Sequence, residues 1–321
     1  MRITIIGAGG VGGYFGAKLT RAGEDVTMIA RGAHLAAIQR SGLRVRSTRE
    51  GEYVVKPVAL DDPTGRPPAD AVLLCVKSFD TDEALARVRP VVSAGTPVLT
   101  LQNGIAGPER IEAVLGPGHA LGGAAYVFAN IEAPGIIAHR FLGRIALGEL
   151  DGRVTERGER LRNAFAGAGV PAELTTEIHR VMWEKYLLIC AQAGMSALTR
   201  ANTGAMRAEA ETWRMYREIL EELAAIGARA GAAMPGDVVD RLMAAAEALA
   251  PETTSSMHHD LTSGKRLELE GLHGHAVRLG ERFGIRTPPL SAVYAALKPS
   301  SMGPPGGGAI APPPGGGGRR G

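Results

Sequence analysis

The chain has 321 residues, enough for two domains, and its 45% hydrophobic and 21% charged residues match an ordinary globular protein. This balance excludes a wholly disordered or fibrous protein, and a net charge of +3 without basic runs argues against a nucleic-acid partner. The sequence contains no apolar stretch of 18 residues and no signal-peptide pattern, and its two cysteines lie in apolar runs. We therefore expect a cytoplasmic protein with reduced, buried thiols that does not bind membranes.

Short apolar runs alternate with helical stretches through the first half of the chain. Parallel strands are predicted at Ile3–Ile6, Val26–Ile29, Ala71–Val76 and Val98–Leu101, and a helix at Val11–Ala22. Residues 43–47 and 53–58 read as a small hairpin, and the strand-rich stretch 120–150 as extra edge strands, before a helix at 155–168 and a strand at 172–175. This order predicts an α/β, Rossmann-type, doubly wound sheet.

The second half changes character, because residues 177–298 contain no convincing strand. Alanine, leucine, glutamate and arginine recur there at intervals of three and four residues, which predicts an all-α C-terminal domain. We therefore expect a nucleotide-binding domain at 1–176 and a helical domain at 177–298. Residues 299–321 are rich in proline and glycine and are predicted to be a disordered tail.

A glycine-rich segment follows the first predicted strand directly and opens the first predicted helix. It reads Gly7-Ala8-Gly9-Gly10-Val11-Gly12. In this setting the first glycine permits a tight turn, the second lets the backbone approach a pyrophosphate, and the third lets helix and sheet pack closely. The helix N-terminus then faces the anion. The segment predicts a dinucleotide cradle.

The end of the second strand decides between NAD(H) and NADP(H). Asp25 has roughly the sequence spacing of an NAD-type ribose-binding acid but precedes the strand, about 13 Å from the required end. Arg31 stands at the required end, and a guanidinium there suits a 2′-phosphate. Lys77, after the Ala71–Val76 strand, offers a second cation at the same sheet edge. These residues favour NADP(H).

The residues 7–18, GAGGVGGYFGAK, resemble the ketopantoate reductase family of NADPH-dependent 2-dehydropantoate 2-reductases. The resemblance extends in order to about residue 297. Four further segments carry it: Lys77, Gln102-Asn103-Gly104 with Glu109, Trp183-Glu184-Lys185, and Ser255-Ser256-Met257 followed by Asp260, Gly264 and Glu268.

The resemblance implies a role for each matching position. The glycine loop would hold the pyrophosphate, Arg31 and Lys77 would contact the 2′-phosphate, and Asn103 would lie beside nicotinamide and substrate. Lys185 would be the general acid, and Ser256 and Glu268 would bind the 2-keto acid from the helical domain. The chemistry agrees for Lys185, because reducing a ketone leaves an alkoxide that needs a proton donor. Its apolar sequence neighbours would lower the pKa of its amine towards a useful range.

Two positions depart from the family pattern on the predicted helix His179–Met195. Ile189 and Ala193 stand one and two turns after Lys185, where the family usually carries asparagines. Gln192 lies on the same stripe as Lys185 and either supplies a replacement amide to the substrate or bonds a neighbouring helix. Substrate identity is therefore less well defined than fold or cofactor.

The histidines of the helical half do not complete a metal-ligand set. The pairs His258-His259 and His273-Gly274-His275 lack an acid or cysteine at tetrahedral-site spacing, so they read as solvent-facing helix residues and no metal is expected.

These observations predict an NADPH-dependent reductase of ketopantoate, a small 2-keto acid. A paralogue that reduces another branched 2-keto acid and a non-catalytic dinucleotide sensor are the alternatives. Lys185 and Glu268 argue against the sensor, since binding alone needs no proton donor. The sequence leaves a homodimer open.

Overall fold

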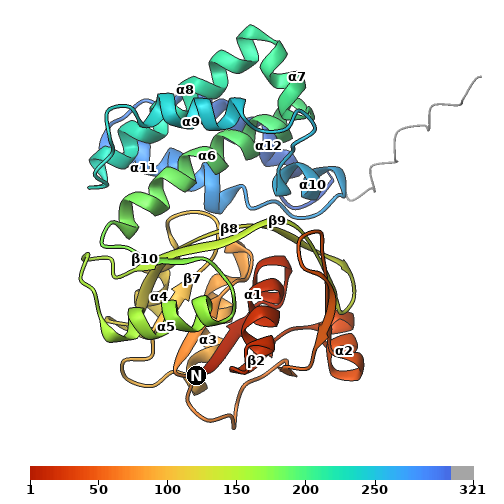
Figure 1. The fold of residues 1–321 in the computed structure, drawn as a ribbon. Coiled ribbons are helices and arrows are strands. Elements are labelled where there is room, and N and C mark those ends of the chain that lie inside the picture. The colour runs from red at the N-terminus through yellow and green to blue at the C-terminus, as the bar shows by residue number, and fades with distance from the viewer. Residues whose placement is uncertain (305–321) are drawn as a thin grey trace, which may run out of the picture. The chain divides into compact units, whose positions relative to one another are not determined.

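The computed structural model describes residues 1–304, and the chain divides into two compact units, Met1–Tyr186 and a unit that begins at Leu187 (Figure 1). The first unit is built on a mostly parallel sheet with flanking helices, and the second is helical. This confirms the predicted fold class. None of the helices in residues 1–304 is both long enough and apolar enough to cross a membrane.

The sheet of the first unit has the strand order β4-β3-β9-β8-β7-β6-β1-β2-β5, with β10 paired to β9. The run from β8 to β5 is parallel, whereas β8 and β9 pair antiparallel. The strands are β1 Arg2–Ile6, β2 Asp25–Ile29, β3 Leu43–Ser47, β4 Gly51–Val55, β5 Val58–Leu60, β6 Ala71–Leu74, β7 Val98–Thr100, β8 Ala120–Ala133, β9 Ile136–Gly148 and β10 Ala172–Leu174.

Five α-helices belong wholly to the described part of the first unit, α6 runs from the first unit into the second, and six more follow. They are α1 Gly10–Arg21, α2 Gly32–Ser41, α3 Thr81–Val88, α4 Gly107–Leu115, α5 Glu156–Gly167, α6 Ile178–Thr199, α7 Thr203–Ala208, α8 Ala210–Arg229, α9 Val238–Glu247, α10 Ser256–Thr262, α11 His275–Phe283 and α12 Pro288–Leu297. A π-helical turn at Glu270–Gly274 precedes α11, and short 3-10 turns occupy Ser78–Asp80, Arg89–Val91 and Lys298–Ser300.

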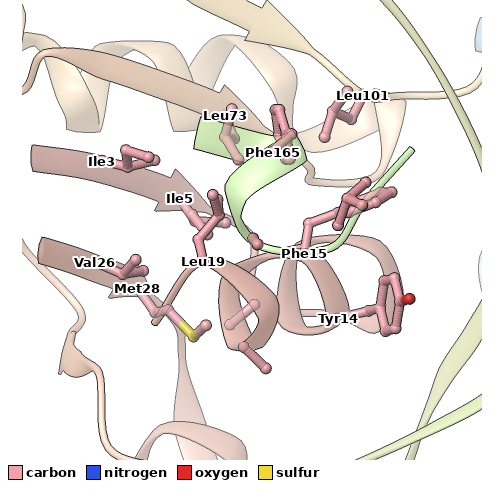
Figure 2. Packing of buried hydrophobic residues seen from close by; sticks show 14 of the residues in the cluster. Ile3, Ile5, Tyr14, Phe15, Leu19, Val26, Met28, Leu73, Leu101 and Phe165 are labelled. Carbon is pink, nitrogen blue, oxygen red and sulfur yellow. The ribbon is translucent and has the colours of Figure 1, made fainter. Parts of the chain in front are cut away.

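The strand residues alternate between two cores because successive side chains point to opposite faces of a sheet. Ile3 and Ile5 of β1 belong to the core beneath α1 and α5, together with Phe15 and Phe165 (Figure 2). On β6, which pairs with β1, Val72 and Leu74 face the other core, which α3 and α4 cover. The parallel strands are thus buried on both faces, which explains their continuous apolar sequences.

Three sequence-based assignments differ from the structure. The strands of residues 120–150 are two long strands that lie between β7 and β3, so they are interior rather than edge strands. Val58 belongs not to the hairpin but to β5, which pairs with β2. The segment 299–304 forms a 3-10 turn and a bend, and Leu267 N donates to Ser301 O at 2.9 Å, in place of the expected disorder. The rest of the predicted tail lies outside the described residues.

The boundary between the two compact units falls after Tyr186, inside α6. The physical reason is that Ile178 and Met182, in the first turns of α6, pack on Ala124 of β8 and Ala146 of β9. This packing assigns the start of α6 to the sheet-containing unit.

Candidate active site

Four predicted site segments lie at one edge of the sheet. The glycine loop follows β1, Arg31 follows β2, Lys77 comes shortly after β6, and Asn103 comes shortly after β7. These strands are parallel neighbours, so their carboxyl ends share an edge. The chain extends from β1 towards β2 on one side and towards β6 on the other, and ligands of open α/β sheets bind at such a switch point.

The glycine loop fits an anionic group. Gly7 has φ +100°, and a Cβ there would lie 2.7 Å from the Val76 backbone nitrogen, so only glycine is accommodated. A Cβ on Gly9 would have no atom within 4 Å, which leaves open space over the loop. Gly9 is the N-cap of α1, no side chain among residues 1–304 caps this helix, and its first turn carries no acid. The first backbone N–H groups of α1 thus lack a side-chain partner and suit a phosphate.

Gly10 has a different structural reason for being glycine. A Cβ there would clash with the backbone carbonyl of Ala129, where β8 crosses the start of α1. Gly12 likewise admits no side chain, because a Cβ would clash with the carbonyl of Gly7. The second glycine of the Gly9-Gly10 pair is therefore explained by strand packing as well as by its place in the predicted cradle.

His34 holds the glycine loop in place, and the sequence reasoning missed it. Its Nδ1 accepts a hydrogen bond from Gly135 N at 3.0 Å, and a backbone N–H can only donate. The Nε2 atom therefore carries the proton and donates to the carbonyl of Ala8 at 2.9 Å. Burial lowers the pKa of His34, which favours this neutral form. The sequence signal was a polar residue three positions after Arg31, on the helix that follows β2.

Arg31 is the N-cap residue of α2, at the carboxyl end of β2, as the sequence predicts. Its side chain is 55% exposed and pairs with Asp80 at 3.0 Å and with Glu83 at 3.5 Å. Exposed ion pairs of this kind contribute little free energy, so the guanidinium can exchange them for a stronger anionic partner. Asp25 is the first residue of β2, at the opposite end from Arg31.

The loop after β6 is fixed by a buried amide. Gln102 Nε2 donates to the carbonyl of Val76 at 2.9 Å and to Thr81 Oγ1 at 2.8 Å. These bonds join the segment after β7 to the segment that carries Lys77. Lys77 is partly exposed and occupies the N-cap position of the turn Ser78–Asp80. Gln102 therefore positions both neighbouring site segments.

Lys185 and Asn103, 82 residues apart in the sequence, lie together in the first unit. Lys185 Nζ donates to Asn103 Oδ1 at 3.2 Å and lies 5.8 Å from the centre of the Tyr126 ring. The helix around Lys185 is anchored by Trp183 and Tyr186, both about 1% exposed. Burial raises the pKa of the Tyr126 phenol, so this ring stays uncharged. The arrangement places an amine, an amide and a phenol beside one another.

Within the second unit, Gln192 bonds neighbouring helices. It is buried, its Nε2 donates to Thr203 Oγ1 at 2.9 Å, and its Oε1 accepts from Tyr216 at 3.4 Å. Of the two interpretations of Gln192, the structure shows the contact with neighbouring helices, and a contact with the substrate stays a prediction. The Nε2 group and the Oε1 atom of the amide each have a partner, as is usual for a buried amide.

The two other substrate-binding residues predicted for the helical half differ in burial. Ser256 is the exposed first residue of α10, whereas Ser255 before it caps the helix and bonds Ser196 of α6 at 2.8 Å. Glu268 is buried, and its backbone carbonyl accepts from Leu272 N at 3.1 Å. Ser256 is thus the exposed hydroxyl of the serine pair, and Glu268 is a buried acid.

His273 corrects the expectation of solvent-facing histidines. It is fully buried, and its Nε2 lies 2.9 Å from the carbonyl of Cys190. The π-helical turn at Glu270–Gly274 adds a residue to the helical turn and so rotates His273 inward. Burial lowers the pKa of His273 to about 4, so the ring is neutral at pH 7. Residues 1–304 contain no group of three or more histidine, cysteine or acidic side chains that could hold a metal.

Comparison with known proteins places the chain. The family model described as ketopantoate reductase PanE/ApbA matches residues 3–152, and the model for the C-terminal part matches residues 177–301. The chain belongs to the ketopantoate reductase family. The resemblance noted in the sequence is thereby confirmed.

Relatives with names and solved structures agree. A 2-dehydropantoate 2-reductase of Mesorhizobium japonicum is 33% identical over 93% of this chain and 97% of its own length. A 2-dehydropantoate 2-reductase structure from Geobacter metallireducens is 32% identical, covers 93% of this chain and 99% of its own, and superposes with a TM-score of 0.87. A PanE/ApbA family structure from Ralstonia eutropha is 33% identical over 94% and 98%, with a TM-score of 0.86. The family assignment makes the chain an oxidoreductase.

Proposed function

We propose that the protein reduces 2-dehydropantoate to pantoate with NADPH. The single observation that carries this proposal is the contact of Lys185 Nζ with Asn103, on the first unit and at the sheet edge that also bears the uncapped glycine loop. The similarity to relatives named 2-dehydropantoate 2-reductase supports the choice of substrate.

The residues at this edge suit a phosphorylated dinucleotide. The residues Gly7, Ala8, Gly9, Gly10, Val11 and Gly12 would hold the pyrophosphate, while Arg31 and Lys77 would contact the 2′-phosphate. When bound, the reduced nicotinamide supplies a hydride to C2 of the keto acid. Asn103 would lie beside both nicotinamide and substrate.

Lys185 would act as the general acid. Hydride addition to the ketone leaves negative charge on the carbonyl oxygen, and the Lys185 ammonium would donate the proton that converts it to a hydroxyl. The Lys185 ammonium donates to Asn103 Oδ1. The Nδ2 group of Asn103 therefore remains to donate to the ketone oxygen of the substrate. Glu268 would act with Lys185 as a catalytic residue, and Ser256 and Glu268 would bind the keto acid.

A panel assay tests the function. NADPH oxidation by the pure protein would be followed with 2-dehydropantoate, with branched 2-keto acids that lack its terminal hydroxyl, and with NADH in place of NADPH. Fastest turnover of 2-dehydropantoate with NADPH supports the proposal. Faster turnover of another keto acid would identify a paralogue. Dinucleotide binding without turnover of any keto acid would instead identify a sensor.

His34 should govern the response of the glycine loop to acid. Its folded-state pKa is lowered, so the neutral ring stabilises the fold fully above the ordinary value of about 6.5. This stabilisation is lost as the pH falls below that value. We expect acidification from about pH 7.5 to about 5.5 to lower the thermal unfolding midpoint less in His34→Gln than in the wild type, because glutamine does not titrate.

A comparison of two substitutions tests the hydrogen bond from His34 to the glycine loop. The amide of the introduced glutamine can still donate to the Ala8 carbonyl, whereas the side chain in His34→Leu cannot. NADPH should therefore bind His34→Gln with near wild-type affinity and His34→Leu about 2- to 12-fold more weakly, the worth of one neutral hydrogen bond. If acidification lowered the thermal unfolding midpoint equally in the wild type and in His34→Gln, His34 would not govern the response of the loop to acid.

Ile189 should set the preference between hydroxylated and apolar keto acids. It is half-buried and lies one turn after Lys185 on α6. We expect Ile189→Asn to raise kcat/KM for 2-dehydropantoate over a keto acid without the terminal hydroxyl by about 2- to 12-fold, the worth of one hydrogen bond. Leu188 is also half-buried and lies about 100° around the helix from Ile189, so Leu188→Asn is the matched control. Equal ratios in both variants would show that this stripe does not set specificity.

A further inference from the structure

Tyr126 and Arg144 form a cross-strand pair beside Lys185. They lie directly opposite each other on β8 and β9, and the Arg144 guanidinium carbon lies 3.8 Å from the centre of the Tyr126 ring. Tyr126 packs against the apolar cluster that the start of α6 makes with the sheet. The pair therefore lies on the same face of the sheet as the helix that carries Lys185.

Two cations share this tyrosine ring. Lys185 Nζ lies 5.8 Å from the ring centre, so the ammonium and the guanidinium approach a single aromatic group. Arg144 is exposed and forms no ion pair with any residue between 1 and 304. Of the acids near the ring, Glu184 is held by Arg180 at 2.8 Å, and Glu173 lies on β10 opposite Ala146. The positive charge of Arg144 is therefore available to a ligand.

A stacked guanidinium is suited to bind a carboxylate. Stacking uses the face of the planar group, and the N–H groups that are not turned to the Tyr126 hydroxyl remain for the oxygens of a carboxylate. A 2-keto acid carries its carboxylate on the carbon next to the ketone, so the group that binds it must lie close to the group that protonates the ketone oxygen. Arg144 lies 3.8 Å and Lys185 5.8 Å from the centre of the same ring, which brings the two cations into one neighbourhood on the first unit.

We propose that Arg144, stacked on Tyr126, binds the carboxylate of the keto acid and so restricts the enzyme to anionic substrates. This rests on the function proposed above, with Lys185 at the ketone. Tyr126 is then a positioning residue, because its ring holds the guanidinium in one plane. Neutral ketones and esters would lack the charge that Arg144 recognises.

The test compares a keto acid with its methyl ester. KM and kcat would be measured with NADPH for 2-dehydropantoate and for the methyl ester of the same keto acid, in the wild type and in Arg144→Gln. We expect Arg144→Gln to raise KM for the acid about 10- to 100-fold, the worth of a charge-assisted contact, and to change KM for the ester less than about threefold. Tyr126→Phe should keep the preference for the acid, and Tyr126→Leu should weaken it.

Arg140→Ala is the matched control, because it removes an exposed arginine from the same strand. It should leave both KM values unchanged. An Arg144→Gln variant that binds the acid as the wild type does, or that loses acid and ester equally, would overturn the carboxylate contact alone. A wild type that reduces no 2-keto acid would overturn the proposed function, and the contact with it.

Discussion

Replacing Lys185 with alanine should lower kcat about 100- to 10,000-fold, the usual contribution of a positioned general acid. NADPH should still bind, because the glycine loop and Arg31 are untouched. Lys185→Arg should restore little, since arginine keeps the positive charge but does not release a proton at useful pH. Steady-state kinetics with 2-dehydropantoate, together with NADPH titration by fluorescence, measure both effects.

The neighbouring phenol provides the sharpest control. Tyr126 lies beside Lys185 and stays protonated because burial raises the pKa of its hydroxyl, so it is the rival proton donor. If Lys185 is the acid, Tyr126→Phe should retain most of kcat. Full kcat in Lys185→Ala, combined with a large loss in Tyr126→Phe, would transfer the role to Tyr126.

Replacing Arg31 with alanine should raise KM for NADPH roughly 10- to 150-fold and change KM for NADH much less. A charge-assisted contact to a phosphate is worth about 1.5–3 kcal/mol, whereas the exposed pairs with Asp80 and Glu83 are worth at most about 1 kcal/mol. The phosphate should therefore displace the carboxylates. The NADPH to NADH ratio of kcat/KM, in wild type and variant, measures the effect.

Arg40→Ala supplies the comparison, since Arg40 is an exposed arginine at the other end of α2. It should leave the cofactor ratio unchanged. A loss of NADPH and NADH affinity to the same extent in Arg31→Ala would mean that Arg31 supports the loop without reading the 2′-phosphate.

Local patterns were sufficient for the glycine loop and for the parallel strands β1, β2, β6 and β7. The glycine loop lies between a strand and a helix because the tight turn at Gly7 and the close packing at Gly12 need no distant partner. The apolar runs of β1 and β6 were recognised for a similar reason, since burial on both faces leaves a continuous signature. These features were therefore predictable from residues close together in the chain.

Features that depend on distant residues were not predictable in this way. The positions of β8 and β9 inside the sheet follow from pairing with β3 and β7, which no local pattern records. His273 turns inward because of a π-helical turn, and helical periodicity assumes a uniform turn. The family resemblance implied that Lys185 and Asn103 both serve the active site, but no spacing in the sequence predicts a contact between residues 82 positions apart.

Gln192 and His34 both show that a sequence pattern does not reveal hydrogen-bond partners that are distant in the chain. A glutamine on the stripe of Lys185 satisfied the sequence criterion for a ligand contact, yet Thr203 and Tyr216 from other helices bond its amide. His34 carried no motif, yet two backbone groups far apart in the chain bond its ring. Hydrogen-bond partners, rather than residue type, decided both outcomes.

The location of the unit boundary inside α6 has a consequence for the design of truncated forms of the protein. A fragment that stops at the end of the first family model, residue 152, or just before α6, would lose Ile178 and Met182. The apolar surface of Ala124 and Ala146 would then face water, and such a fragment would tend to aggregate. It would also separate the amine of Lys185 from its amide partner on the nucleotide-binding half. A truncation designed to isolate that half should therefore end after Tyr186, with the first turns of the helix retained.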